Sequence, residues 1–242
     1  MRRVIVLTGG FGSGKSEIAI NLALSLAVKE KTALVDLDIA NPYFRSREVR
    51  HFLAEQGVKV IVPRDEWLDA DLPILSPGLR SLLLDTSIRV VLDVGGDEIG
   101  ATALGVYQAD FNKIEHHLLM VVNPFRPYTR DPDRIAVMCR EIERTSRLKM
   151  NGIISNPNLG QATELNHVLW GHEIVVQAAE KLSLPILGLG VLANRLEQWR
   201  SQLTETITNT VKHFDLMQPL PLIPIHIYLL PEWLKSRPSS CP

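Results

Sequence analysis

The stretch LTGGFGSGKSE at residues 7–17 is crowded with glycines and lies between two strongly patterned segments. Before it, RVIVLT at residues 3–8 is a continuous apolar run of the kind found in strands that are buried on both faces. After it, residues 16–29 carry apolar side chains at helical spacing. Glycine adopts backbone conformations that other residues avoid, so the stretch can turn sharply. The chain must therefore begin as strand, tight turn and helix.

The same alternation of apolar strands and helical segments continues along the chain. It predicts parallel βαβ units in one α/β fold, a doubly wound, mostly parallel sheet flanked by helices. A loop rich in Pro and Asp is expected at residues 63–77. Strands are predicted at 3–8, 32–38, 58–62, from 88 to the glycines at 95–96, 116–124, 151–157 and 185–191, and helices at 16–29, 41–57, 77–86, 131–146, 172–182 and 195–213.

The last part of the chain has a different character, so we predict a domain at 1–218 and an arm or tail at 219–242. The arm is apolar but contains Pro219, Pro221, Pro224 and Pro231. Proline interrupts helices, so an amphipathic membrane helix is excluded here. An extended arm packed on the domain is expected, and docking onto a partner is the alternative.

Composition narrows the functional classes. The net charge of −1 gives no basic excess, so nucleic-acid binding is not expected. The two cysteines, Cys139 and Cys241, form no C-x-x-C pair, which argues against a zinc site or a disulfide framework. No apolar run reaches membrane-spanning length, and no export signal is recognised. We therefore expect a cytoplasmic protein.

The glycine-rich stretch also satisfies the pattern G-x-x-x-x-G-K-[ST]. The glycines allow backbone N–H groups to point at phosphate oxygens, and the following helix presents its N-terminus to the same charge. Lys15 would neutralise the β- and γ-phosphates, and the Ser16 hydroxyl would bind Mg²⁺. The residues predicted to bind nucleotide here are Gly9, Gly10, Phe11, Gly12, Ser13, Gly14, Lys15, Ser16 and Glu17.

Two other interpretations of the turn stay open. A dinucleotide loop requires G-x-G-x-x-G, and Lys15 stands where the third glycine belongs. Asp36 and Asp38 do lie near the place expected of a ribose-binding acid. A glycine turn without a ligand would leave a lysine unexplained at a tight strand-to-helix junction. The G-K-S ending favours the triphosphate.

A triphosphate site needs a second acidic strand, and VVLDVGGDE at residues 90–98 supplies one. Asp93 would hold Mg²⁺, and the Gly96 N–H would bond the γ-phosphate and so sense hydrolysis. Asp38, in VDLDIANP, would approach the metal or the attacking water. The alternative for Asp36 and Asp38 is that they cap the next helix.

Taken together, GGFGSGKS, LVDLDIANP and VVLDVGG resemble the MinD/ParA/CobQ-like (SIMIBI) branch of P-loop nucleotidases, over roughly residues 3–195. The resemblance implies a three-layer ATPase that uses ATP and Mg²⁺, with Asp38 supporting the attack of water and Asp93 in the second acidic motif. It also implies that Asn156 touches adenine. A guanine site would read N-K-x-D, but residues 156–159 read NPNL, which favours ATP over GTP.

The chain departs from this family at one position. Gly10 stands where MinD and ParA relatives carry a signature lysine that reaches across a dimer. The cations that could replace it are Arg45, Arg47, Arg126 and Arg130.

We expect an ATP-driven switch that acts on a protein partner or forms a homodimer. The alternatives are a small-molecule kinase or ATP-dependent ligase of the CobQ/dethiobiotin synthetase type, and an ATP-dependent assembly factor that does not hydrolyse ATP.

Overall fold

The computed structural model describes residues 2–37, 47–62, 77–210 and 220–229. Every strand pairing in the described chain is parallel, and one sheet of eight strands has the order β3-β2-β4-β1-β5-β6-β7-β8. The predicted parallel α/β sheet is confirmed. The strands are β1 (Val4–Thr8), β2 (Thr32–Asp36), β3 (Val58–Ile61), β4 (Arg89–Asp93), β5 (His116–Val122), β6 (Gly152–Ser155), β7 (Ile186–Leu192) and β8 (Leu222–Ile225).

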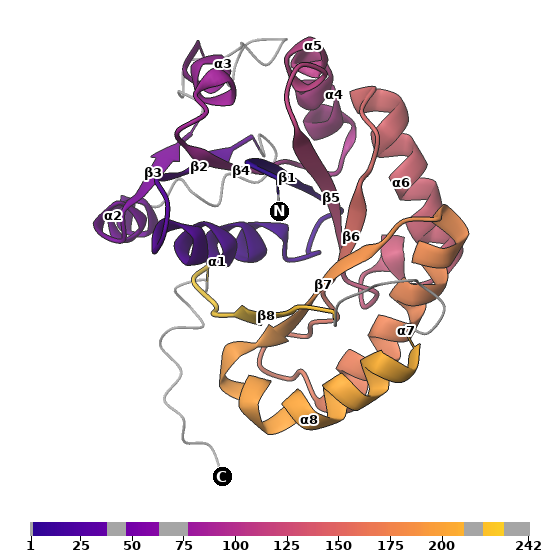
Figure 1. Ribbon diagram of the computed structural model, residues 1–242. Helices are drawn as coiled ribbons and strands as arrows, with labels where there is room; N and C mark the ends of the chain where they lie inside the picture. Colours follow the sequence, from indigo (N-terminus) through magenta and orange to yellow (C-terminus); the bar gives the residue numbers. More distant parts are fainter. Residues whose placement is uncertain (1, 38–46, 63–76, 211–219, 230–242) are drawn as a thin grey trace.

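Helices cover both faces of the sheet (Figure 1). On one face, α1 and α2 pack on side chains such as Ile5, Leu34 and Val91. On the other face, α3 to α8 enclose a larger core that includes Val6, Leu92 and Phe111. The helices are α1 (Lys15–Ala27), α2 (Arg47–Glu55), α3 (Pro77–Leu84), α4 (Glu98–Val106), α5 (Gln108–Phe111), α6 (Pro132–Ser146), α7 (Leu165–Leu182) and α8 (Ala193–Thr210).

Strand β1 lies in the middle of this sheet, between β4 and β5. Its residues 4–7 are completely buried, as the continuous apolar run predicts. Because the strands are parallel, the carboxyl ends of β1, β4, β5 and β6 open at one edge of the sheet. In such folds the ligand binds outside the carboxyl ends of the strands.

Several predictions need correction. The structure adds α4 and α5 between β4 and β5, and α7 begins at Leu165 rather than at residue 172. Helix α2 covers the later part of the predicted helix 41–57, whereas residues 41–46 and the predicted loop at 63–76 lie outside the described residues.

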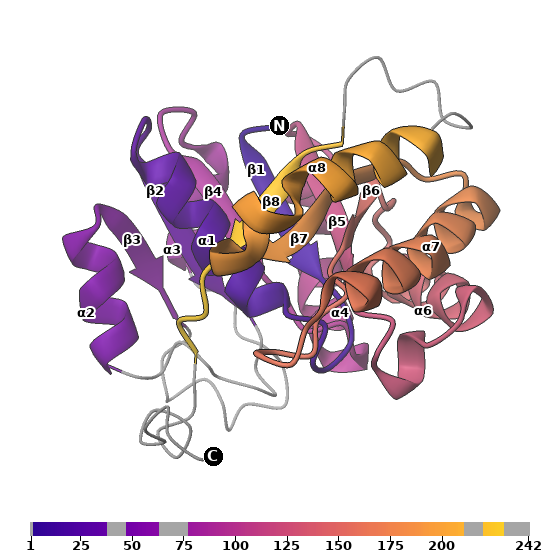
Figure 2. The ribbon, with the colours of Figure 1, turned by 90° about the horizontal axis from the view of Figure 1, so that it is seen from below.

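The segment predicted as an extended arm contributes strand β8, which pairs with β7 from Leu222 to Ile225. Figures 1 and 2 show β8 beside β7 and close to α1. The domain boundary at residues 218/219 stays a prediction.

Candidate functional site

The glycine-rich stretch forms a tight loop between β1 and α1. Gly12 and Gly14 have φ angles of 72° and 86°, in the left-handed region that favours glycine. The Ser13 N–H donates to the Gly10 carbonyl over 3.1 Å and closes a turn inside the loop. The loop therefore has the context that a phosphate loop requires, directly before the N-terminus of a long helix.

Lys15 and Ser16 are the first two residues of α1, and each is only 6% exposed. Ser13 is more deeply buried still, and its hydroxyl has no hydrogen-bond partner among the described residues. The first N–H groups of a helix have no partner within the helix and carry its positive dipole end. A buried hydroxyl, an ammonium group and a helix N-terminus thus meet in one short segment.

Two buried carboxylates end neighbouring strands at the edge of the sheet where the loop follows β1. Asp36 ends β2 and Asp93 ends β4, and the two residues are direct partners in the parallel register. Leu34 and Val91, two residues earlier in each strand, belong to the core against α1. Side chains two residues apart share a face of the sheet, so both carboxylates point to the face that carries α1. Asp38 lies outside the described residues.

The turn after β4 lies directly on the glycine loop. A Cβ atom added at Gly96 would overlap the backbone of Gly9, so only glycine allows this approach. The Thr8 hydroxyl donates to the Gly95 carbonyl over 3.3 Å. Asp97 then caps α4 by accepting the Gly100 N–H at 2.8 Å. A movement of this turn would therefore displace the glycine loop, and a movement of the loop would displace the turn.

Three side chains from the ends of β5 and β6 hold carbonyls of the loop. Asn156 Nδ2 donates to the Ser13 carbonyl at 2.7 Å, and Arg126 Nε donates to the Gly12 carbonyl at 2.9 Å. Asn123 Nδ2 lies 3.4 Å from the same Gly12 carbonyl. Asn123 was missed in the sequence, although the repeated Asn-Pro after β5 and β6 is a signal that could have revealed it.

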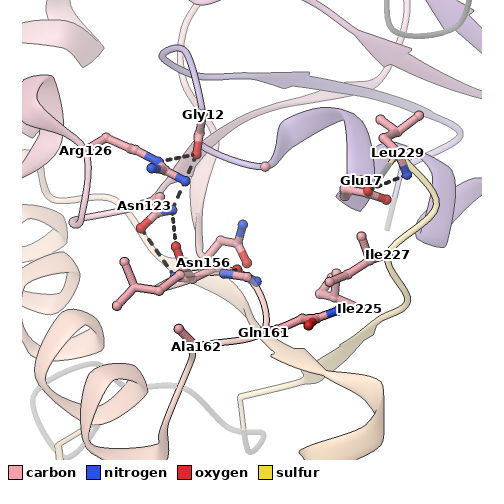
Figure 3. A pocket seen from close by; sticks show the side chains of 14 residues that line it. Gly12, Glu17, Asn123, Arg126, Asn156, Gln161, Ala162, Ile225, Ile227 and Leu229 are labelled. Carbon is pink, nitrogen blue, oxygen red and sulfur yellow. Dashed lines mark hydrogen bonds between the residues drawn. The ribbon is translucent and has the colours of Figure 1, made fainter. Parts of the chain in front are cut away.

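A cavity of about 530 Å³ opens next to the loop (Figure 3). Four of the residues predicted to bind nucleotide line it, namely Gly12, Gly14, Glu17 and Asn156. The other residues predicted to bind nucleotide do not line this cavity, and Phe11 is 68% exposed; they are Gly9, Gly10, Phe11, Ser13, Lys15 and Ser16. The other lining residues, most of them not predicted, are Asn123, Arg126, Asn158, Leu159, Gly160, Gln161, Ala162, Ile225, Ile227 and Leu229.

The candidate arginines differ in their position relative to the glycine loop. Arg126 lies over the loop and lines the cavity. Arg130 is largely exposed, and its Nε is 3.8 Å from an Asp131 carboxylate oxygen. The side chains of Arg45 and Arg47 lie outside the described residues. At Gly10 a Cβ atom would lie 3.0 Å from Met138 Cε.

Glu17 is a half-buried acid that lines the cavity. Burial raises the pKa of the Glu17 carboxyl, while two backbone N–H groups that bond the carboxylate act in the opposite direction. Within the described residues, no group of three or more His, Cys, Asp or Glu side chains could hold a metal ion by itself.

Comparisons with known proteins address the fold. No protein-family model matches the chain, and no curated protein matches its sequence. Solved structures do match: chloroplast FtsY of Physcomitrella patens and FtsY of Thermotoga maritima each give a TM-score of 0.53, at 15% and 16% identity. The chain has the fold of a P-loop NTPase.

The matches cover 79% of this chain and 59% of the Physcomitrella protein, and 78% of this chain and 61% of the Thermotoga protein. FtsY of Mycoplasma mycoides aligns with a TM-score of 0.52 at 17% identity, over 79% of this chain and 60% of that one. The chain thus spans about three-fifths of the length of these FtsY structures. No helix in the described ranges has the length and apolar character needed to cross a membrane.

Proposed function

We propose that the protein binds ATP with Mg²⁺ and hydrolyses it, and that the nucleotide state controls a protein partner. The observation that carries this proposal is the loop between β1 and α1, with left-handed glycines followed at once by Lys15 and Ser16 at the helix start. Loops of this kind bind phosphates through backbone N–H groups and the helix dipole.

Lys15 neutralises charge on the β- and γ-phosphates, and the loop amides from Gly9 to Gly14 bind their oxygens. Unsatisfied buried groups support a ligand at this place. Ser13 Oγ and Asn156 Oδ1 are buried without hydrogen-bond partners among the described residues. Such groups are rare in proteins unless a ligand, ion or water completes them.

A hydroxyl and a carboxylate are the donors that Mg²⁺ uses in phosphate-binding sites, together with phosphate oxygens and water. Ser16, at the start of α1, and Asp93, on the same face of the sheet, fit that donor set. Asp38 is the third proposed ligand. Bound Mg²⁺ would neutralise charge that develops on the transferring phosphoryl group.

Water is the proposed acceptor, oriented by Asp38 rather than activated by a strong base. Gly95 and Gly96 report the γ-phosphate, because their turn already lies on the loop. A shift of this turn would move α4, which is continuous with it, and so change the surface that a partner protein or a second copy of the chain would bind.

The choice of ATP over GTP depends on the segment after β6. Asn156 uses its Nδ2 on the Ser13 carbonyl, which leaves Oδ1 as an acceptor. An acceptor matches the exocyclic amino group of adenine. Guanine recognition would need a carboxylate for its N1–H and amino group, and Asn156-Pro157-Asn158-Leu159 contains none.

Titration calorimetry with ATP and GTP, with and without Mg²⁺, tests binding, and phosphate release tests hydrolysis. The proposal predicts Mg²⁺-dependent ATP binding and slow turnover that a partner accelerates. Turnover that appears only with an added metabolite would instead favour the kinase or ligase class. Tighter binding of GTP would contradict the proposed base preference.

A further inference from the structure

The side chains of residues 225–229, which read IHIYL, point to alternating sides. Ile225, Ile227 and Leu229 line the cavity beside the glycine loop. Tyr228 instead contacts Phe52 of α2, with ring centroids 5.4 Å apart. Successive side chains of an extended chain point to opposite sides. This segment, which we call the C-terminal wall, thus turns one apolar edge toward the cavity.

Two side chains of α1 hold the C-terminal wall in place through its backbone. The Glu17 carboxylate accepts the Leu229 N–H at 2.7 Å and the Tyr228 N–H at 3.0 Å. One helical turn later, Asn21 donates to the His226 carbonyl at 2.8 Å and accepts the His226 N–H at 2.9 Å. These bonds depend on backbone groups of the wall, so they fix its position whatever its side chains are.

The wall is therefore tied to the helix that carries the proposed phosphate-binding residues. Glu17 follows Ser16 directly, and it lines the same cavity as Gly12 and Gly14. Figure 3 shows Ile225, Ile227 and Leu229 facing Asn156 and Arg126 across the cavity. One side of the cavity is apolar, and the other carries amide groups and a guanidinium group.

This division of the cavity matches a nucleoside rather than a phosphate. Aliphatic side chains offer phosphate oxygens no hydrogen-bond donors, and the half-buried Glu17 carboxylate would repel them. A flat aromatic base can pack its face on aliphatic side chains while its polar edge meets amides, which is the usual composition of small-molecule sites. We propose that the C-terminal wall forms the nucleoside side of the ATP site; this inference rests on the proposed function and identifies where its base lies.

The test compares ATP with inorganic tripolyphosphate, which lacks the nucleoside. In Ile227→Ser, the removal of one apolar contact should weaken ATP binding about tenfold. Tripolyphosphate should bind as it does to the unmodified chain. Ile223→Ser is the matched control on β8, since Ile223 packs against Gly188 and does not line the cavity. It should leave the affinity for both ligands unchanged.

Equal losses for ATP and tripolyphosphate in Ile227→Ser, or no loss of ATP affinity, would overturn the inference. A second measurement uses the unmodified chain, in case the variant does not fold. An ATP analogue with a photoreactive azide on adenine should label the peptide that contains residues 225–229. Labelling confined to other peptides would contradict the proposal that the base lies against the C-terminal wall. An unmodified chain that binds neither ATP nor tripolyphosphate would refute the proposed function itself.

Discussion

Asn156 shows how single residues support the site, because one amide group joins β6 to the glycine loop. Its Nδ2 bonds the buried Ser13 carbonyl. In Asn156→Ala that carbonyl loses its partner, and we expect the free energy of unfolding to fall by about 1–3 kcal/mol. ATP affinity should fall as well. Urea unfolding and calorimetry measure both, with the exposed Asn112→Ala as control. Unchanged stability of Asn156→Ala would contradict the role given to this bond.

His172 makes a prediction that does not depend on any ligand. Burial lowers the pKa of its imidazole to about 4, because the charged form is disfavoured away from water. The unfolded chain would bind a proton near pH 6.5. The folded chain keeps His172 neutral, and this difference from the unfolded chain costs no stability above pH 6.5. As the pH falls from 6.5 to 4, the unfolded chain gains a proton that the folded chain does not, and the free energy of unfolding falls by about 3 kcal/mol.

Urea unfolding between pH 7 and pH 4 measures this loss. His172→Gln should remove about 3 kcal/mol of the pH dependence. His51→Gln, at an exposed position on α2, should keep it. An unchanged pH dependence in His172→Gln would show that other groups cause the acid sensitivity.

At the scale of elements, the contact between the β4–α4 turn and the glycine loop joins two strand ends. In Gly96→Ala the new methyl group would meet the Gly9 backbone, so the turn must move away from the loop. We expect a loss of hydrolysis of about tenfold or more. The preference for ATP over ADP should become smaller.

Phosphate release and calorimetry with ATP and ADP test this prediction. Gly57→Ala is the control, because a Cβ atom there meets no atom within 4 Å, although its φ of 80° imposes some strain. Wild-type hydrolysis in Gly96→Ala would disprove the proposed sensing by this turn.

The elements also show what the sequence could predict. The first strand, glycine loop and helix were predictable because their signals are local. The position of Asp93 at the end of β4 was predictable because Asp93 ends an apolar run. Strand β8 was missed because Pro221 and Pro224 suggest an interrupted segment, yet an edge strand tolerates proline. Asn123 and the C-terminal wall were missed because their contacts join segments far apart in the chain.

At the scale of the whole molecule, β8 covers the edge of β7 and brings the wall to α1. Deleting residues 219–242 would expose the backbone of β7 and remove the backbone groups of the wall that bond Glu17 and Asn21. Exposed strand edges promote aggregation, so we expect an insoluble or strongly destabilised protein. A stable, soluble chain without 219–242 would contradict this account.

The central claim is that a glycine loop followed by Lys15 holds a triphosphate. Calorimetric titration of Mg-ATP into the wild-type chain and into Lys15→Ala tests it most directly. We predict saturable binding to the wild-type chain and a loss of at least about tenfold in Lys15→Ala, because the buried ammonium group no longer faces the phosphates. Absence of binding to the wild-type chain, or equal affinity in Lys15→Ala, would contradict the claim.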